Sequence, residues 1–460
     1  MHKLLNFLKN GANLYAVILA LVGLLLVFLV PPYQSPDEQT HLYRAYQLSE
    51  GHIVAKKLSY GAGDILPSSL SKSFDQYYYL LFSPDKKVDR AVYTKSIETP
   101  LNKNKTTETR FENTAIYPPF AYVPQIIAVG IGRIFNASPV ILLYMARLAN
   151  LATWVAILWL AMRRNGKVRL PLLAFGLVPI VAFQAASASA DVVTAAVAIF
   201  FVLEVCRLLT TKAAITRNQI ILLTATAVTL ALCKFPYILL SLTALLIPAS
   251  RFASRKSAWK ARALTLGPAW AIALTWVVIA QKTFVNLRVE AQSGMQLHYI
   301  LTAPLGFAKT LYNTYVSLPS DGLYIQMIGQ LGWLDTKLPF WVLLCSALAV
   351  VLATLSVSFD KKSPEPTTFQ RLVTLGLTLV TIGAISTLLY LTWNAPRATV
   401  IDGLQGRYYI PLFGAFLLAG GGLLKLLPEQ AKRAQTIVYV LLGLEVIVTI
   451  VTIALRYYSL

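Results

Sequence analysis

Long apolar runs dominate this 460-residue chain, and they restrict what it can fold into. Many of them reach about 18–22 residues, the length that an α-helix needs to cross a hydrocarbon core of about 30 Å. Hydrophobic residues make up 56% of the chain and charged residues only 13%. We therefore predict an all-α polytopic membrane protein. The apolar segments are 14–30, 118–135, 139–162, 170–188, 191–209, 218–234, 235–250, 263–281, 339–358, 369–393, 406–425 and 434–456.

The charges are unevenly distributed between the loops. The formal net charge is +21, and the excess of Lys and Arg lies mainly in short loops such as 163–169, 251–262 and 432–433. This distribution is typical of cytoplasmic loops, so it argues against binding to nucleic acid. The long segment 31–117 instead holds 10 of the 20 acidic residues together with 11 Lys or Arg. We expect it to be external, with tyrosines such as Tyr93 and Tyr117 anchoring it at the membrane surface.

The number of crossings depends on the segment 118–135. Pro118, Pro119 and Pro124 interrupt it, so we favour an interfacial or re-entrant helix there. That choice gives 11 crossings and an external C-terminus, whereas a spanning helix gives 12. The expected divisions are a first transmembrane helix in 1–30, an external loop with juxtamembrane helices in 31–117, transmembrane helices in 118–281, a second external segment in 282–338, and transmembrane helices in 339–460.

A group of ionisable residues follows the first apolar run. In a continuous helix, Asp37, His41 and Arg44 fall within about 60° of one another on one face. A carboxylate there can accept a proton from a substrate hydroxyl, with the imidazole and the guanidinium as binding groups. Asp37 is the preferred catalytic base, and Glu38, about 100° away, is the second choice. The alternative is structural: Ser35-x-x-Glu38 forms a helix-capping box, and His41 and Arg44 only pair with the acids.

Other candidates lie at the expected external ends of apolar runs. Arg407 and Tyr408 start one such run, and an arginine there suits a phosphate. Lys234 stands at a break before Pro236, where it can meet an anionic head group. Asp191 and Asp335 are further candidates for substrate binding. The alternatives are snorkelling for the two cations, helix capping for Asp191, and a turn for Asp335.

Several common sites are missing from the sequence. Cys206, Cys233 and Cys345 lie singly in apolar runs, without the spacing of a disulfide framework or a zinc site. There is also no phosphate-binding loop and none of the short motifs of soluble hydrolases. An ATP-driven function is therefore not expected.

Three ordered motifs carry a resemblance to a known family. They are Pro36-Asp37-Glu38-x-x-His41-x-x-Arg44-Ala45-Tyr46, the stretch LGWLDTKLP at 331–339, and QGRYYIP at 405–411. Together they resemble a bacterial membrane-protein family catalogued as a domain of unknown function, which is similar to the GT-C glycosyltransferases. This resemblance implies a GT-C-like bundle in the bacterial inner membrane. It also implies an active site on the periplasmic or external face.

The resemblance also implies a reaction. GT-C enzymes take a sugar from a polyprenyl-phosphate carrier and transfer it to a polysaccharide or lipid-linked glycan, here of the O-antigen type. Asp37 matches the catalytic acidic position, and Arg407 is by analogy a ligand of the carrier phosphate. Some GT-C enzymes need a divalent metal and others do not. No second carboxylate stands out as a metal ligand beside Asp37, so we expect no cofactor and favour a reaction without a metal over one that uses a divalent metal. The alternatives are a transporter of lipid-linked sugars, a glycan polymerase or ligase, and a protein without enzymatic activity.

Overall fold

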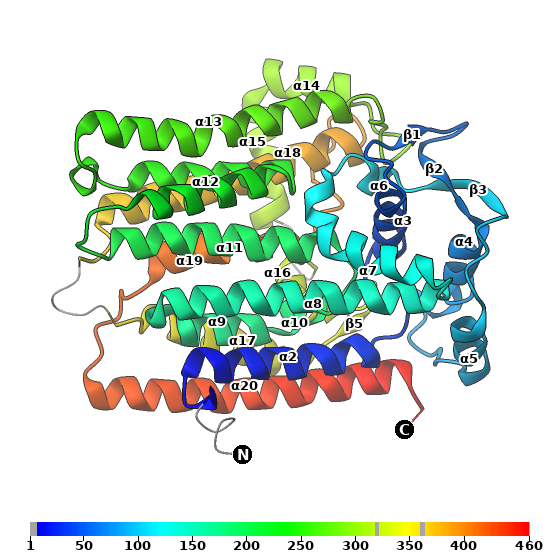
Figure 1. The fold of residues 1–460 in the computed structure, drawn as a ribbon, viewed down its shortest axis with the longest axis horizontal. Coiled ribbons are helices and arrows are strands. Elements are labelled where there is room, and N and C mark those ends of the chain that lie inside the picture. Colours follow the sequence, from blue (N-terminus) through cyan, green and yellow to red (C-terminus); the bar gives the residue numbers. More distant parts are fainter. Residues whose placement is uncertain (1–6, 318–321, 359–363, 460) are drawn as a thin grey trace.

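The computed structural model describes residues 7–317, 322–358 and 364–459. Helices lie side by side along one direction and form a bundle, as expected for an all-α polytopic membrane protein (Figure 1). Six of the described helices are long and apolar enough to cross a membrane. They are α2 (Gly11–Leu29), α8 (Pro139–Arg164), α11 (Ala190–Leu209), α13 (Arg255–Ala280), α18 (Thr368–Trp393) and α20 (Pro428–Tyr457).

Shorter helices account for the other apolar runs. A seventh candidate is the bent pair Gly166–Leu177 and Pro179–Ala185, whose two parts meet at 84°. The described residues thus contain six or seven helices of full span length, and the expected count of eleven or twelve crossings stays a prediction that depends on the shorter apolar helices. The shorter elements are α9 (Arg169–Leu177), α10 (Pro179–Ala185), α12 (Arg217–Ala231), η4 (Phe235–Leu246), α17 (Phe340–Leu355), η7 (Gly406–Leu412) and α19 (Phe413–Gly420).

The segment 118–135 forms a short 3₁₀ turn, η2 (Pro119–Tyr122), and the helix α7 (Val123–Ile134). A 12-residue α-helix is about 18 Å long, which is too short for a hydrocarbon core of about 30 Å. This segment is therefore not among the helices of full span length, and its expected interfacial or re-entrant position stays a prediction.

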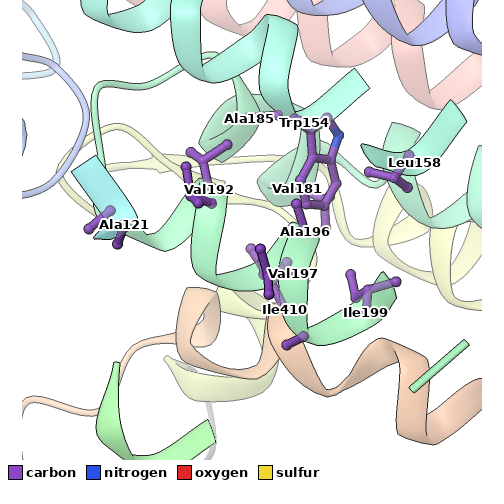
Figure 2. Close-up of a cluster of buried hydrophobic side chains, with 14 of the residues drawn as sticks. Ala121, Trp154, Leu158, Val181, Ala185, Val192, Ala196, Val197, Ile199 and Ile410 are labelled. Atoms are coloured by element: carbon purple, nitrogen blue, oxygen red, sulfur yellow. The ribbon is translucent and has the colours of Figure 1, made fainter. Parts of the chain in front are cut away.

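Helix α11 forms the centre of the bundle, and 94% of its most apolar 18-residue stretch is buried. Its side chains Val192, Ala196 and Ile199 belong to a cluster of buried apolar residues (Figure 2). The same cluster contains Trp154 of α8 and Ile410 of η7. Because α11 is enclosed by other helices, its first turn is held at a fixed place at one end of the bundle.

The segment 31–117 packs at that end of the bundle and contains a sheet that the sequence analysis did not predict (Figure 1). Three short antiparallel strands pair in the order β1-β2-β3. Their register pairs Lys56 with Gly63 and Ile65 with Glu108. The elements here are α3 (Glu38–Ser49), β1 (Lys56–Lys57), β2 (Ala62–Pro67), α4 (Ser68–Asp75), η1 (Tyr78–Leu80), α5 (Arg90–Glu98), β3 (Thr106–Arg110) and α6 (Glu112–Ala115).

The connections rich in Lys and Arg lie at the opposite end of the bundle. The link from α8 to α9, the link from α11 to α12 and the start of α13 are all far from the strands β1–β3 (Figure 1). The end of α20 instead reaches the 31–117 segment, where the Val88 N–H donates to the Tyr457 carbonyl at 2.8 Å. The remaining described elements are α14 (Ser293–Thr302), α15 (Pro304–Tyr312), η6 (Asn313–Ser317), α16 (Leu323–Gln326), β4 (Gln330–Leu331) and β5 (Thr336–Lys337).

Candidate functional site

The start of helix α3 differs from the capping box that was the structural alternative. The helix begins at Glu38, and Asp37 precedes it in the left-handed conformation with φ of 61°. No side chain caps this end; only the Ser35 backbone carbonyl accepts a bond, from the Glu38 N–H. Aspartate tolerates this backbone region better than most residues. The turn separates the two acids, so that the Asp37 side chain is 29% exposed and the Glu38 side chain is fully buried.

Asp37 belongs to a cluster of two acids and two cations that come from distant parts of the chain. Arg407 forms an ion pair with Asp37 through Nη2, and its Nε lies 3.7 Å from Asp191 Oδ2. Lys234 forms an ion pair with Asp191 Oδ1. Asn113 of α6 donates to Asp37 Oδ1 at 3.1 Å. We call Asp37, Asp191, Lys234 and Arg407 the four-charge cluster, and its formal charges sum to zero.

Only one member of the four-charge cluster has substantial contact with solvent. Asp37 is 29% exposed, whereas the side chains of Asp191, Lys234 and Arg407 are at most 8% exposed. Burial of charge is costly unless each charge is paired, which these contacts achieve. A substrate that approaches the cluster therefore meets the Asp37 carboxylate first.

Aromatic rings surround the two cations. The Lys234 ammonium lies 4.3 Å from the ring centroid of Tyr117 and 5.9 Å from that of Tyr408, and the Arg407 guanidinium lies 5.5 Å from that of Tyr408. Such cation–π contacts stabilise cations that have lost their water.

His41 links helix α3 to the start of α11. Its Nδ1 lies 2.8 Å from the Tyr122 hydroxyl, and its Nε2 lies 3.1 Å from the hydroxyl of Ser189, the residue that caps α11. Burial lowers the pKa of His41 to about 3, and the charge of nearby Lys234 adds to this effect. The imidazole is therefore neutral at neutral pH and holds the first turn of α11, which carries Asp191, against α3.

Glu38 forms an ion pair with an arginine that the sequence analysis missed. Arg147 of α8 donates to the Glu38 carboxylate from Nε at 2.8 Å and from Nη2 at 2.7 Å, and both side chains are fully buried. The Ala188 N–H donates to Glu38 Oε1 at 2.9 Å. The second choice for a catalytic base thus lies in an ion pair closed to solvent. One sequence signal could have identified Arg147 as this partner: it is an arginine in the middle of an apolar run.

Two other candidates lie outside the four-charge cluster. Arg44 is fully buried and donates to the carbonyls of Ile53 at 2.9 Å and Tyr117 at 3.0 Å. The expected grouping of Asp37, His41 and Arg44 on one face is therefore wrong, since the helix begins only after Asp37 and Arg44 binds a neighbouring loop. Asp335 pairs with Arg456 at 2.8 Å, which joins the β4–β5 turn to the end of α20.

A close backbone approach fixes the position of Arg407. A Cβ atom on the preceding residue, Gly406, would stand 2.1 Å from the backbone carbonyl carbon of Gln326. Only glycine permits this approach without a shift of the backbone. The Arg407 side chain then crosses to the start of α3, where Nη1 donates to the Pro36 carbonyl at 2.7 Å.

Comparison with known proteins identifies one match. A family model described as a predicted membrane protein (DUF2142) matches residues 19–415, which is most of the chain. Neither the curated proteins nor the solved structures contain a match. In the described residues, no group of three or more His, Cys, Asp or Glu is arranged to hold a metal ion.

Proposed function

We propose that this chain, which belongs to the DUF2142 family of predicted membrane proteins, is a GT-C-type glycosyltransferase of the bacterial inner membrane. Its donor is a sugar on a polyprenyl-phosphate carrier, and its acceptor is a hydroxyl of a polysaccharide or lipid-linked glycan. The observation that carries this proposal is the partly exposed Asp37 carboxylate, which pairs with the buried Arg407 in a cluster that also holds the buried Lys234.

The loops support the proposed direction of the site in the membrane. The connections rich in Lys and Arg lie at the end of the bundle opposite to the 31–117 segment (Figure 1). Such loops are typical of the cytoplasmic side, which supports a position of the four-charge cluster on the periplasmic or external face. A polyprenyl-phosphate sugar is confined to the bilayer, with its phosphate at the surface. The cluster and the reacting bond are thereby held at a similar depth.

The proposed reaction is a direct displacement. Asp37 takes the proton of the acceptor hydroxyl, whose oxygen attacks C1 of the donor sugar. The bond between C1 and the phosphate oxygen breaks, and the electron pair leaves with the carrier phosphate. Attack from the opposite side of the leaving group inverts the anomeric centre.

Arg407 has two roles in the proposed reaction. Its ion pair and its bond to the Pro36 carbonyl hold the Asp37 carboxylate in place. Its positive charge, together with that of Lys234, also favours the negative charge that develops on the departing phosphate. A fixed cation next to a developing charge stabilises the transition state more than water does.

The test is glycan analysis of cells that carry the intact chain, Asp37→Asn, or neither. Mass and linkage analysis should detect a sugar that is present with the intact chain and absent with Asp37→Asn. Asp85→Asn is the matched control, because Asp85 is an exposed acid of the same 31–117 segment. It should keep the sugar. If the sugar persists with Asp37→Asn at normal protein levels, Asp37 is not the base and the proposed mechanism fails.

A further inference from the structure

A polar cavity lies between α8, α11 and α12, at the end of the bundle opposite to the four-charge cluster. Its volume is about 360 Å³, and its lining residues are Arg164, Arg207, Asn218, Gln219 and Leu222. Arg164 is the last residue of α8, and Asn218 is the second residue of α12. The cavity is therefore at the level where these helices reach the membrane surface among the basic loops.

Two arginines in this cavity share one buried carboxylate. Arg164 donates to Glu204 from Nε at 2.6 Å and from Nη2 at 2.9 Å. Arg207 donates to Glu204 from Nε at 3.2 Å and from Nη2 at 2.9 Å. The three formal charges sum to +1. The arginine side chains are 31% and 17% exposed, whereas Glu204 is 4% exposed, so the positive groups face the cavity.

The start of α12 adds neutral donors to the cavity. Gln219 accepts a bond from the Thr216 N–H at 2.9 Å through Oε1, as part of a capping box. Its Nε2 remains as the donor end of the amide, and Asn218 supplies a second, exposed amide. The N-terminal end of a helix also favours a negative charge. The lining therefore offers mainly donors to a ligand.

We propose that this cavity binds the phosphate of an anionic phospholipid head group in the leaflet next to the basic loops. Two guanidiniums offer donors in a plane, which matches the oxygens of a phosphate. Basic pockets between transmembrane helices on the cytoplasmic side are suited to such head groups. Leu222, one turn further into α12 than Asn218, supplies an apolar wall on the membrane side.

The experiment uses the purified full-length chain and counts retained lipids by native mass spectrometry. Phosphatidylglycerol is the anionic probe, and phosphatidylcholine is the neutral probe. We expect Asn218→Glu to lower the retained phosphatidylglycerol by about fivefold, as expected for one unit of charge near a head group. Because Asn218 is exposed, this variant leaves the Arg–Glu–Arg contacts in place. Arg207→Gln should also lower retention.

Lys432→Gln is the matched control, since it makes the same change in charge on an exposed basic residue of α20 at the same end of the bundle. Its retention of phosphatidylglycerol should equal that of the unmodified chain. Equal losses in Asn218→Glu and Lys432→Gln would mean general surface attraction and would overturn the proposal. Inorganic phosphate is tested in parallel: if it displaces phosphatidylglycerol at millimolar concentration, the site is one for free phosphate and the assignment to lipid is wrong.

Discussion

Substitution of Arg147 by methionine should destabilise the protein strongly. Arg147 uses its guanidinium in five hydrogen bonds, two of them to Glu38. The other three go to the carbonyls at the end of helix α2, which are those of Val27 at 3.0 Å, Val30 at 2.6 Å and Pro31 at 2.9 Å. One side chain therefore joins α2, α3 and α8. Methionine is also unbranched, but it is shorter and cannot donate any of these bonds.

The magnitude follows from burial. Arg147 and Glu38 are both fully buried, so removal of the arginine leaves an unpaired carboxylate in a dry environment. Breaking such a pair costs about 3–5 kcal/mol of unfolding free energy. The double variant Glu38→Gln with Arg147→Met removes both charges. It should recover part of this loss, because no unpaired carboxylate remains, while the carbonyls of Val27, Val30 and Pro31 still lack their donor.

The assay is equilibrium unfolding in detergent, followed by the loss of helical circular dichroism. The matched control is Lys425→Met, which breaks the pair between Lys425 and Glu365. These side chains are 65% and 41% exposed, so their pair contributes only about 0–1 kcal/mol. If Arg147→Met costs no more than Lys425→Met, or if the double variant is no more stable than Arg147→Met, the argument from burial is wrong.

Three further predictions concern the candidate site. The pKa of His41 is about 3 in the folded protein and 6.5 in a free chain, so its contribution to stability is complete above pH 6.5 and is lost as the pH falls towards 3. The loss is about 0.7 kcal/mol per pH unit at pH 6.5, where the free imidazole is half protonated, and approaches about 1.4 kcal/mol per pH unit about one unit lower. Unfolding of His41→Gln across this range should show a flatter profile. Gly406→Ala should reduce sugar transfer because its Cβ meets backbone, whereas Gly383→Ala, with no atom within 4 Å of its Cβ, should leave transfer unchanged. Asp191→Asn removes the carboxylate that pairs with Lys234 and lies near Arg407, so it should lower the free energy of unfolding by about 3–5 kcal/mol in the same assay. The double variant Asp191→Asn with Lys234→Met should restore stability but not sugar transfer.

The sequence predicted the members of the four-charge cluster better than their contacts. Acids and cations are rare in the apolar background of this chain, so each one at the end of an apolar run stood out. Their convergence was not readable from the sequence, because Asp37 and Arg407 are 370 positions apart. Helical periodicity also failed for Arg44, since it assumed that the helix continued through Asp37. The left-handed turn at Asp37 has no sequence signature beyond the residue type itself.

Arg147 shows a second limit of the sequence. Its partner Glu38 lies 109 positions away, and local patterns carry no information about such pairs. An arginine inside an apolar run was nevertheless a usable signal, because an unpaired charge is costly at that depth. The strands β1–β3 were missed because they are two to six residues long and lie in a polar segment. Strands this short give little periodicity.

The expected number of crossings exceeds the number of long helices because several apolar runs form short or divided elements. Whether these shorter elements cross the membrane stays a prediction. The element η4 (Phe235–Leu246) is a 3₁₀-helix of 12 residues, which at about 2.0 Å per residue extends about 24 Å. The run 406–425 divides into η7 and α19, of seven and eight residues. Neither part alone reaches the thickness of a hydrocarbon core.

The neutral sum of the four-charge cluster has a consequence for the proposed reaction. Before the reaction, Asp37 and Asp191 balance Arg407 and Lys234. When Asp37 accepts the proton of the acceptor, its negative charge disappears, and the Arg407 guanidinium is left without its main partner. In the same step a negative charge develops on the leaving phosphate. Proton transfer therefore strengthens the attraction of Arg407 for the phosphate at the moment when the bond to C1 breaks, which couples the base and the leaving group through one cation.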